Sequence, residues 1–111
     1  MYEYKVNKVI KIIDGDTIDI EIDLGFSISI RQRIRLADID APETRTLDIK
    51  EKEKGILAKE WLEEHLKDKE LIIKTIKEEK YGRMLGYLYI KDDHLSINYR
   101  MILEGFVKKY K

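Results

Sequence analysis

The sequence predicts a mainly β protein, a five-stranded barrel with two helices that forms a single domain over residues 1–111. Three observations support this prediction. Apolar and polar residues alternate with a period of two along much of the chain up to residue 36. A helix-like stretch at about 54–67 separates the first three strands from two later strands, and a second at about 97–104 follows them. A chain of 111 residues is long enough to bury one modest core.

Three consecutive strands are predicted in the first part of the chain, at residues 6–13, 17–24 and 26–36. The second strand alternates isoleucine with acidic residues, as expected of a half-buried strand. The third strand alternates similarly, so Arg31, Arg33 and Arg35 project together from one face. Gly25 marks the turn between these two strands.

A loop followed by a helix is predicted for the middle of the chain. Pro42 ends regular strand pairing, because proline has no N–H to donate. Residues 44–54 are polar and lack periodicity, so we expect a mobile loop there. From 54 to 67 apolar residues fall on one helical stripe, and Trp61 belongs to that stripe rather than to a base-stacking site.

Two more strands are predicted at residues 70–77 and 84–90. Ser96 is a suitable N-cap for the second helix, which Gly105 would end, and a short extended tail follows. Three antiparallel strands, a helix, two strands and a helix are the order of a five-stranded OB barrel.

Composition excludes several classes of protein. Lys plus Arg and Asp plus Glu both number 22, so the net charge is zero. The net charge therefore does not indicate that the chain binds nucleic acid. There is no cysteine and there are two histidines, so a bound metal is expected to have oxygen ligands. No apolar run is long enough to span a membrane, and we expect no membrane partner. No signal peptide is visible, which predicts a cytoplasmic protein, or a secreted one if a leader has been removed.

Two acidic runs are the strongest functional signal. Ile13-Asp14-Gly15-Asp16-Thr17 and Ile39-Asp40-Ala41-Pro42-Glu43-Thr44 place carboxylates where apolar strands end. Such a cluster suits a hard cation and leaves one carboxylate for proton transfer. Arg35 precedes the second run, and Lys80-Tyr81-Gly82-Arg83 adds further cations. Carboxylates together with paired arginines suit phosphodiester cleavage.

Each of these residues also has a plainer interpretation. Asp14 and Asp16 would form a tight turn in any fold, and Asp38 is interpreted as a solvated turn carboxylate. Arg31 and Arg33 are expected to form a solvated strand face that pairs with acids across the hairpin.

Aromatic residues of the later strand also have two interpretations. Tyr87 and Tyr89 are interpreted as barrel packing, although OB barrels do stack bases on such residues.

Taken together and in this order, the motifs closely resemble those of the staphylococcal (micrococcal, thermonuclease) nuclease family. The resemblance runs from about Val6 to Phe106 and implies an OB-type barrel that uses Ca²⁺ to hydrolyse phosphodiester bonds of DNA and RNA. It implies that Asp16 and Asp40 bind Ca²⁺ through their side chains and Ala41 through its backbone carbonyl. A well-known member has threonine at the position of Ala41, and alanine keeps that carbonyl.

The resemblance also assigns the remaining site residues. Glu43 would be the general base or would order the attacking water, Arg35 and Arg83 would contact the phosphate, and Asp14 would support the ligands. Tyr81 would help to hold the nucleotide's terminal phosphate, and the neighbouring Lys80 would also contact phosphate.

One departure from the family pattern concerns the end of the chain. The chain stops at Lys111, so the family's long C-terminal helix is not expected, and stability is expected from another source such as self-association. Tyr110 is only a loose counterpart of the family's nucleotide-side tyrosine.

We therefore expect a Ca²⁺-dependent, sugar-nonspecific endonuclease that prefers single-stranded DNA and RNA and leaves 3′-phosphates. No obligate protein partner is expected. The alternative is a non-catalytic OB barrel that binds nucleic acid or protein. Such domains are expected to lose acids or arginines, and this sequence retains Asp16, Asp40, Glu43, Arg35 and Arg83.

Overall fold

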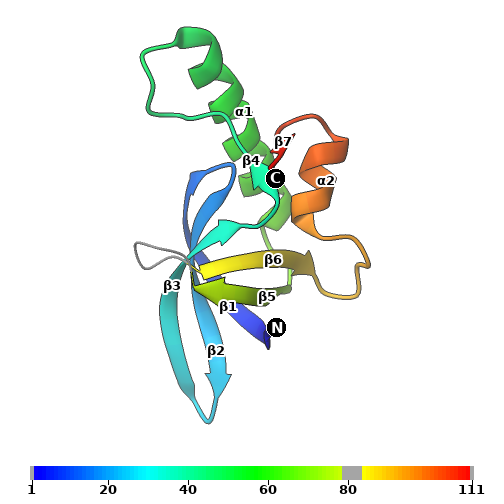
Figure 1. Ribbon diagram of the computed structural model, residues 1–111. Helices are drawn as coiled ribbons and strands as arrows, with labels where there is room; N and C mark the ends of the chain where they lie inside the picture. The colour runs from blue at the N-terminus through cyan, green and yellow to red at the C-terminus, as the bar shows by residue number, and fades with distance from the viewer. Residues whose placement is uncertain (1, 79–83, 111) are drawn as a thin grey trace.

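A computed structural model describes residues 2–78 and 84–110. Seven strands and two helices are present in these residues (Figure 1). In chain order they are β1 (Tyr2–Asp14), β2 (Thr17–Gly25), β3 (Ile28–Leu36), β4 (Ile39–Asp40), α1 (Ile49–Leu66), β5 (Leu71–Glu78), β6 (Met84–Ile90), α2 (Ile97–Leu103) and β7 (Lys108–Lys109).

Five of the strands close into a barrel in the order β1-β2-β3-β6-β5. All neighbours are antiparallel except β3 and β6, which pair in parallel over Ile34–Leu36. Buried side chains of these strands and of both helices form one core, in which Ile18, Leu62 and Met101 are fully enclosed. This arrangement confirms the predicted mainly β class and the OB-like barrel with two helices.

Helix α1 begins earlier than predicted. It starts at Ile49 rather than near residue 54, so the expectation of a loop over 44–54 is wrong for its second half. The Asp48 carboxylate caps the helix by accepting the backbone N–H groups of Lys50 and Glu51. The first turns are exposed, and they project beyond the barrel in Figure 1. A fully solvated helical turn needs no apolar stripe, and this is why periodicity did not reveal it.

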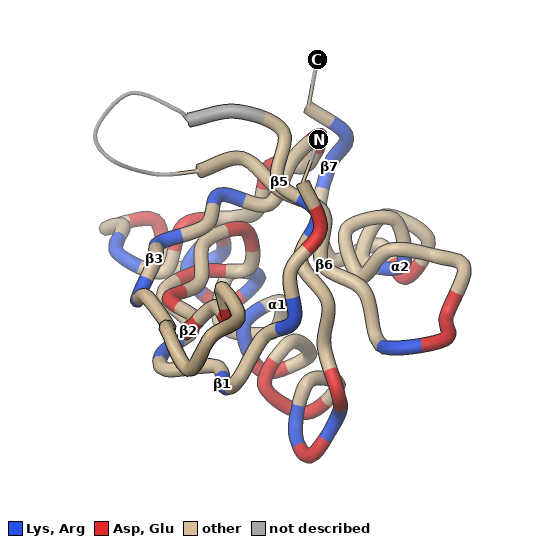
Figure 2. The backbone as a smooth tube through the Cα atoms, turned by 90° about the horizontal axis from the view of Figure 1, so that it is seen from below, with Lys and Arg blue, Asp and Glu red and all other residues tan. Residues whose placement is uncertain are grey.

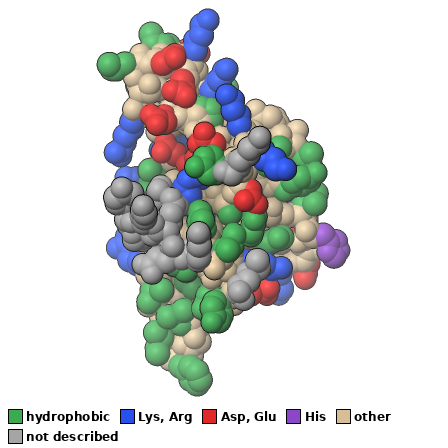
Figure 3. All heavy atoms as spheres, viewed as in Figure 1, with side chains coloured by type: hydrophobic (Ala, Val, Ile, Leu, Met, Phe, Trp, Pro, Cys, Tyr) green, Lys and Arg blue, Asp and Glu red, His purple; other side chains and the backbone are tan. Residues whose placement is uncertain are grey.

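The hairpin of β2 and β3 also differs from expectation. Strand β3 starts at Ile28, because Phe26 and Ser27 form the turn with positive φ angles of 54° and 63°. The apolar face of the strand is buried only where it reaches the barrel, at Ile34 and Leu36. Its distal part is exposed, and Phe26 in the turn is 97% accessible. The β2–β3 hairpin projects from the barrel, with hydrophobic side chains along it (Figures 1 and 3).

Strands β4 and β7 were not predicted. Ile39 pairs with Lys109 and Asp40 pairs with Lys108, so the expected extended tail forms a small sheet with the second acidic run. Ser96 caps α2 by accepting the N–H of Tyr99, as predicted, and Gly105 follows the helix with a φ of +80°.

Charges of both signs are spread along the described parts of the chain, as Figure 2 shows. This distribution agrees with the net charge of zero. Neither of the two helices in the described ranges has the length and apolar character needed to cross a membrane.

Candidate active site

Two glycines allow the acidic runs to meet helix α1. A Cβ atom on Gly15 would lie 2.8 Å from the Cβ of Ala58 and 3.0 Å from that of Ala41. A Cβ on Gly55 would lie 2.7 Å from the carbonyl oxygen of Glu43 and 2.8 Å from that of Pro42. The absence of these side chains lets both runs pack closely on the helix and on each other.

Asp16 is the buried carboxylate of this cluster, at 8% exposure. One oxygen accepts the backbone N–H of Ala41 at 2.9 Å, and the other accepts the Thr17 hydroxyl at 3.0 Å. The first of these bonds joins the two acidic runs directly. Buried carboxylates in proteins are usually paired with a cation.

Arg35 supplies a positive charge between the two runs. Its Nη1 lies 3.5 Å from the Asp16 carboxylate, and its Nη2 lies 3.8 Å from the Asp40 carboxylate. Nη1 also donates hydrogen bonds to the carbonyl oxygens of Leu36 (3.0 Å) and Ile39 (2.9 Å). The guanidinium is therefore fixed by backbone contacts while it faces two carboxylates.

Asp14 supports the loop after β4. One of its carboxylate oxygens accepts the Thr44 hydroxyl at 2.6 Å and the Thr44 backbone N–H at 3.4 Å. This bond fixes the residue directly after Glu43. The contact places Asp14 beside the segment that carries Glu43, and its role in supporting the metal ligands stays a prediction.

Glu43 and Asp40 present their side chains to solvent. The Asp40 side chain is 58% exposed, and Glu43 is exposed on the following segment. Within the described ranges, no hydrogen bond or ion pair holds the Glu43 carboxylate. Both carboxylates are thus accessible to a ligand from outside.

Carboxylates are suitable ligands for a hard cation, but this site contains few of them. In the part of the chain that the structure describes, no group of three or more acidic or histidine side chains is arranged to hold a metal ion. Asp16 and Asp40 approach a common point, as their contacts with one guanidinium show. A hard cation there would complete its shell with backbone carbonyl oxygen and water, both of which Ca²⁺ accepts.

Three of the predicted site residues, Lys80, Tyr81 and Arg83, lie outside the described residues. Their proposed roles stay predictions. The described site therefore contains Asp14, Asp16, Arg35, Asp40, Ala41 and Glu43.

Sequence reasoning missed several contacts around Arg35. The Tyr110 ring lies under its guanidinium at 5.5 Å, a cation–π distance. Asp38, interpreted as a solvated turn carboxylate, instead accepts a hydrogen bond from the Tyr87 phenol. That bond raises the pKa of Tyr87 to about 12, with burial as a smaller cause. The pairing of β4 with β7, which brings Tyr110 here, has no local sequence signal.

Arg33 behaves as expected for the strand face. It makes two hydrogen bonds with Asp19 on β2, at 2.8 and 3.1 Å. The hydrogen bond with Arg33 lowers the pKa of the Asp19 carboxyl. Arg31 and Glu21 are cross-strand partners in the same register. Arg33 thus pairs with Asp19, whereas Arg35 faces Asp16 and Asp40.

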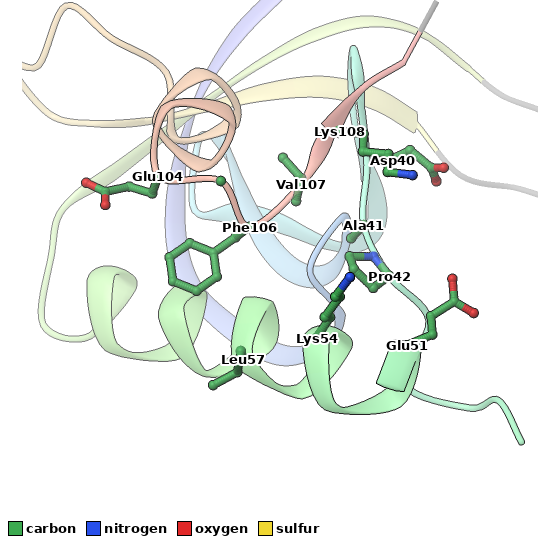
Figure 4. A pocket seen from close by; sticks show the side chains of 11 residues that line it. Asp40, Ala41, Pro42, Glu51, Lys54, Leu57, Glu104, Phe106, Val107 and Lys108 are labelled. Carbon is green, nitrogen blue, oxygen red and sulfur yellow. The ribbon is translucent and has the colours of Figure 1, made fainter. Parts of the chain in front are cut away.

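A groove of about 360 Å³ adjoins the site between α1, β4 and the segment before β7. Its apolar surface includes Leu57 and Phe106, and Figure 4 shows Lys54 extending from α1 toward Pro42. Asp40 stands at the edge of this groove (Figure 4). The candidate site therefore continues into an open surface rather than a closed cavity.

The closed barrel and its acid–arginine cluster define the class of protein: an OB-like barrel with a charged site at the point where β3 and β4 meet. The chain belongs to the staphylococcal nuclease homologue family, whose model matches residues 33–111.

Three proteins with similar sequences are consistent with membership of this family. The chain is 31% identical to an uncharacterized protein of Methanocaldococcus jannaschii, over 98% of this chain and 61% of that protein. It is 30% identical to a thermonuclease of Staphylococcus hyicus, over 91% and 57% of the two chains. It is 32% identical to a micrococcal nuclease of Shigella flexneri, over 94% and 58%. The chain thus spans about three fifths of the length of these relatives.

Proposed function

We propose that this chain hydrolyses phosphodiester bonds of DNA and RNA. The observation that carries the proposal is the Arg35 guanidinium, which lies between the carboxylates of Asp16 and Asp40. A phosphodiester is an anion, so a fixed cation beside acidic groups suits both binding and charge stabilisation. The names of the relatives, thermonuclease and micrococcal nuclease, support the same reaction class.

The residues of the site take separate roles in this proposal. Arg35 binds the phosphate through Nη2, because Nη1 is engaged by backbone carbonyls. Glu43 accepts the proton of the attacking water, since its carboxylate is exposed and without a partner in the described ranges. Thr44 and Asp14 hold the segment that carries Glu43.

Asp16, Asp40 and the Ala41 carbonyl would hold Ca²⁺. When bound, Ca²⁺ supplies neutralisation of phosphate charge and activation of water. Asp16 is fixed for this role by the Ala41 N–H and the Thr17 hydroxyl. Lys80, Tyr81 and Arg83 would complete the phosphate contacts, as the family resemblance implies.

Single-stranded DNA and RNA are the proposed substrates, and 3′-phosphates are the proposed products. Arg35 is proposed to contact phosphate, and phosphate contacts carry no sequence information, which supports cleavage with little sequence preference. Self-association of the chain stays a prediction.

Hydrolysis of denatured DNA and of RNA, measured with Ca²⁺ and with a chelator, tests the proposal. We expect cleavage of both polymers with Ca²⁺, loss of cleavage with the chelator, and products that carry 3′-phosphates. Equal rates in both conditions would remove Ca²⁺ from the mechanism, and no cleavage in either would reject the reaction.

A non-catalytic nucleic-acid-binding or protein-interaction module is the second candidate. One observation favours it: among the described residues, no three acidic or histidine side chains converge as a metal site. This candidate predicts that the chain binds single-stranded oligonucleotides with equal affinity with or without Ca²⁺ and leaves them intact. A binding titration followed by analysis of the oligonucleotide on a denaturing gel separates the two candidates.

A further inference from the structure

The turn between β3 and β4 connects Arg35 to Asp40. Asp38 occupies this turn with a φ of 65°, a left-handed conformation that few residue types adopt readily. Arg35 itself bonds to the carbonyl oxygens on both sides of the turn, at Leu36 and Ile39. The position of the guanidinium relative to the Asp40 carboxylate therefore depends on the shape of this turn.

The inner side of the turn is held by Asn98 of α2. Its side chain is 1% exposed, and its amide nitrogen donates to the carbonyl oxygens of Ala37 (2.9 Å) and Gly86 (3.1 Å). Its amide oxygen accepts the Leu88 N–H at 3.1 Å. This side of the turn is fully bonded to β6 and α2.

The outer side of the turn is held by Tyr87 of β6. Its phenol donates a hydrogen bond to the Asp38 carboxylate. The Asp38 carbonyl accepts the Tyr110 N–H at 2.8 Å, which adds the C-terminal segment to the same anchor. In the described chain, Tyr87 is the side chain that bonds the Asp38 carboxylate from outside the turn.

We infer that Tyr87 is a positioning residue that acts through Asp38 to fix Arg35 and Asp40 for the proposed reaction. This inference rests on the proposed function. Tyr87 touches neither the phosphate-binding guanidinium nor the acidic runs in any described contact. Tyr87 is therefore inferred to act on Arg35 and Asp40 only through the turn that contains Asp38. Tyr89 is a suitable control residue for Tyr87, because it lies two residues further along β6 and so on the same face of the strand.

Tyr87→Phe and Tyr89→Phe are the matched test. Tyr89 is half-buried like Tyr87, and its ring receives the Lys74 ammonium at 4.6 Å, a contact that phenylalanine retains. We expect Tyr87→Phe to lower kcat and kcat/KM together by about 3- to 10-fold with KM nearly unchanged, because a small shift of the turn misplaces groups that act in the transition state. We expect Tyr89→Phe to keep the wild-type values. Equal rates for the two variants would overturn the inference.

Amide hydrogen exchange gives a readout that needs no activity. The Ala41 N–H bonds to Asp16, so its exchange reports whether the second acidic run stays in place. We expect Tyr87→Phe to speed exchange at Ala41 several-fold while core amides such as that of Ile20 stay protected. A uniform increase over the whole barrel, or no change at Ala41, would mean that Tyr87 contributes only general stability. An inactive wild type would reject the proposed function, and this exchange pattern would still decide the inference.

Variants of Asp38 complete the experiment. Asp38→Asn keeps an acceptor and tolerates positive φ, so we expect nearly wild-type kcat. Asp38→Gly keeps the backbone conformation and removes the acceptor, so we expect the same loss as in Tyr87→Phe. Combining Asp38→Gly with Tyr87→Phe should add no further loss, because both remove one interaction. Additive losses would contradict a shared pathway through Asp38.

Discussion

Arg35 illustrates how one side chain is prepared for an anion. Two carbonyl oxygens hold Nη1, a tyrosine ring supports the guanidinium, and Nη2 faces Asp40. Fixing the group in advance reduces the reorganisation that binding would otherwise require. The same contacts limit how many donors Arg35 offers to phosphate, so further groups are expected to complete the phosphate contacts. Ca²⁺ and Arg83 are the groups proposed.

Glu43 offers the sharpest test among single residues. We expect Glu43→Gln to lower kcat by at least about 100-fold, the usual contribution of a general base. The melting temperature should stay unchanged, since the carboxylate is exposed and has no partner in the described ranges. Initial rates on denatured DNA and thermal melts measure both quantities.

Glu60→Gln is the matched control, because Glu60 is an exposed acid on α1. It should keep the wild-type rate. A Glu43→Gln enzyme as fast as the control would remove Glu43 from the reaction.

Helix α1 positions the second acidic run through Gly55. An alanine there would place a Cβ within 2.9 Å of backbone atoms of Glu43 and Pro42, so the run must shift. We expect Gly55→Ala to reduce stability and to lower kcat about 10-fold or more, although alanine favours helices by about 1 kcal/mol over glycine. Urea unfolding and cleavage rates test this.

Lys52→Ala is the comparison variant for helix propensity alone, since Lys52 is exposed on the same helix. It should be close to the wild type in both measurements. A Gly55→Ala protein that is more stable and fully active would show that the close approach of residues 42–43 to α1 is unimportant.

The β2–β3 hairpin supplies a pH prediction. The hydrogen bond with Arg33 lowers the pKa of Asp19 from its ordinary value of 3.8. A carboxyl whose pKa is lower when folded stabilises the fold above its unfolded pKa, and this stability is lost as pH falls through the folded value. Arg33 is about half exposed, so the pair contributes only about 0.2–1 kcal/mol at neutral pH.

Asp19→Asn should therefore lower the free energy of unfolding by that small amount at pH 7. At a pH well below 3.8, where Asp19 is protonated in both states, the variant and the wild type should be equally stable. Urea unfolding at the two pH values measures the difference. A stability gap that persists at low pH would exclude the ion pair as its cause.

The elements also show what sequence patterns reveal. Long strands with a period of two, such as β2, were predicted nearly to their ends, because one face is buried. The first turns of α1 were missed because lysine and glutamate alternate there without an apolar stripe. The pairing of β4 with β7 was missed because two-residue strands far apart in sequence carry no periodic pattern.

At the scale of the whole molecule, the pairing of β2 with β3 brings the two acidic runs together, since Thr17 pairs with Arg35 and the Leu36 N–H donates to the Asp16 carbonyl. Asp16 follows β1 and Ala41 follows β4, yet they share a 2.9 Å hydrogen bond. The motifs indicated which residues belong to the site. The sequence did not show that Asp38 bonds to Tyr87 or that Tyr110 supports Arg35, because both depend on tertiary contacts.

Ligand binding should also stabilise the whole fold. A cation that binds only the folded chain stabilises it by about 2.7 kcal/mol at 100 times its Kd. We expect the melting temperature to rise with Ca²⁺ in the wild type. Asp16→Asn should abolish this rise, because Asp16 is a proposed ligand fixed in place by Ala41 and Thr17. A rise of equal size in the variant would place the cation elsewhere.

The central claim is that the carboxylates around Arg35 act in phosphodiester cleavage. Its most direct test is the rate of single-stranded DNA cleavage in Ca²⁺ by the wild type, Asp16→Asn, Asp40→Asn and Asp19→Asn. We expect the first two variants to lose at least about 100-fold in rate, and Asp19→Asn, whose carboxylate pairs with Arg33 instead, to match the wild type. Wild-type rates in Asp16→Asn and Asp40→Asn would contradict the claim.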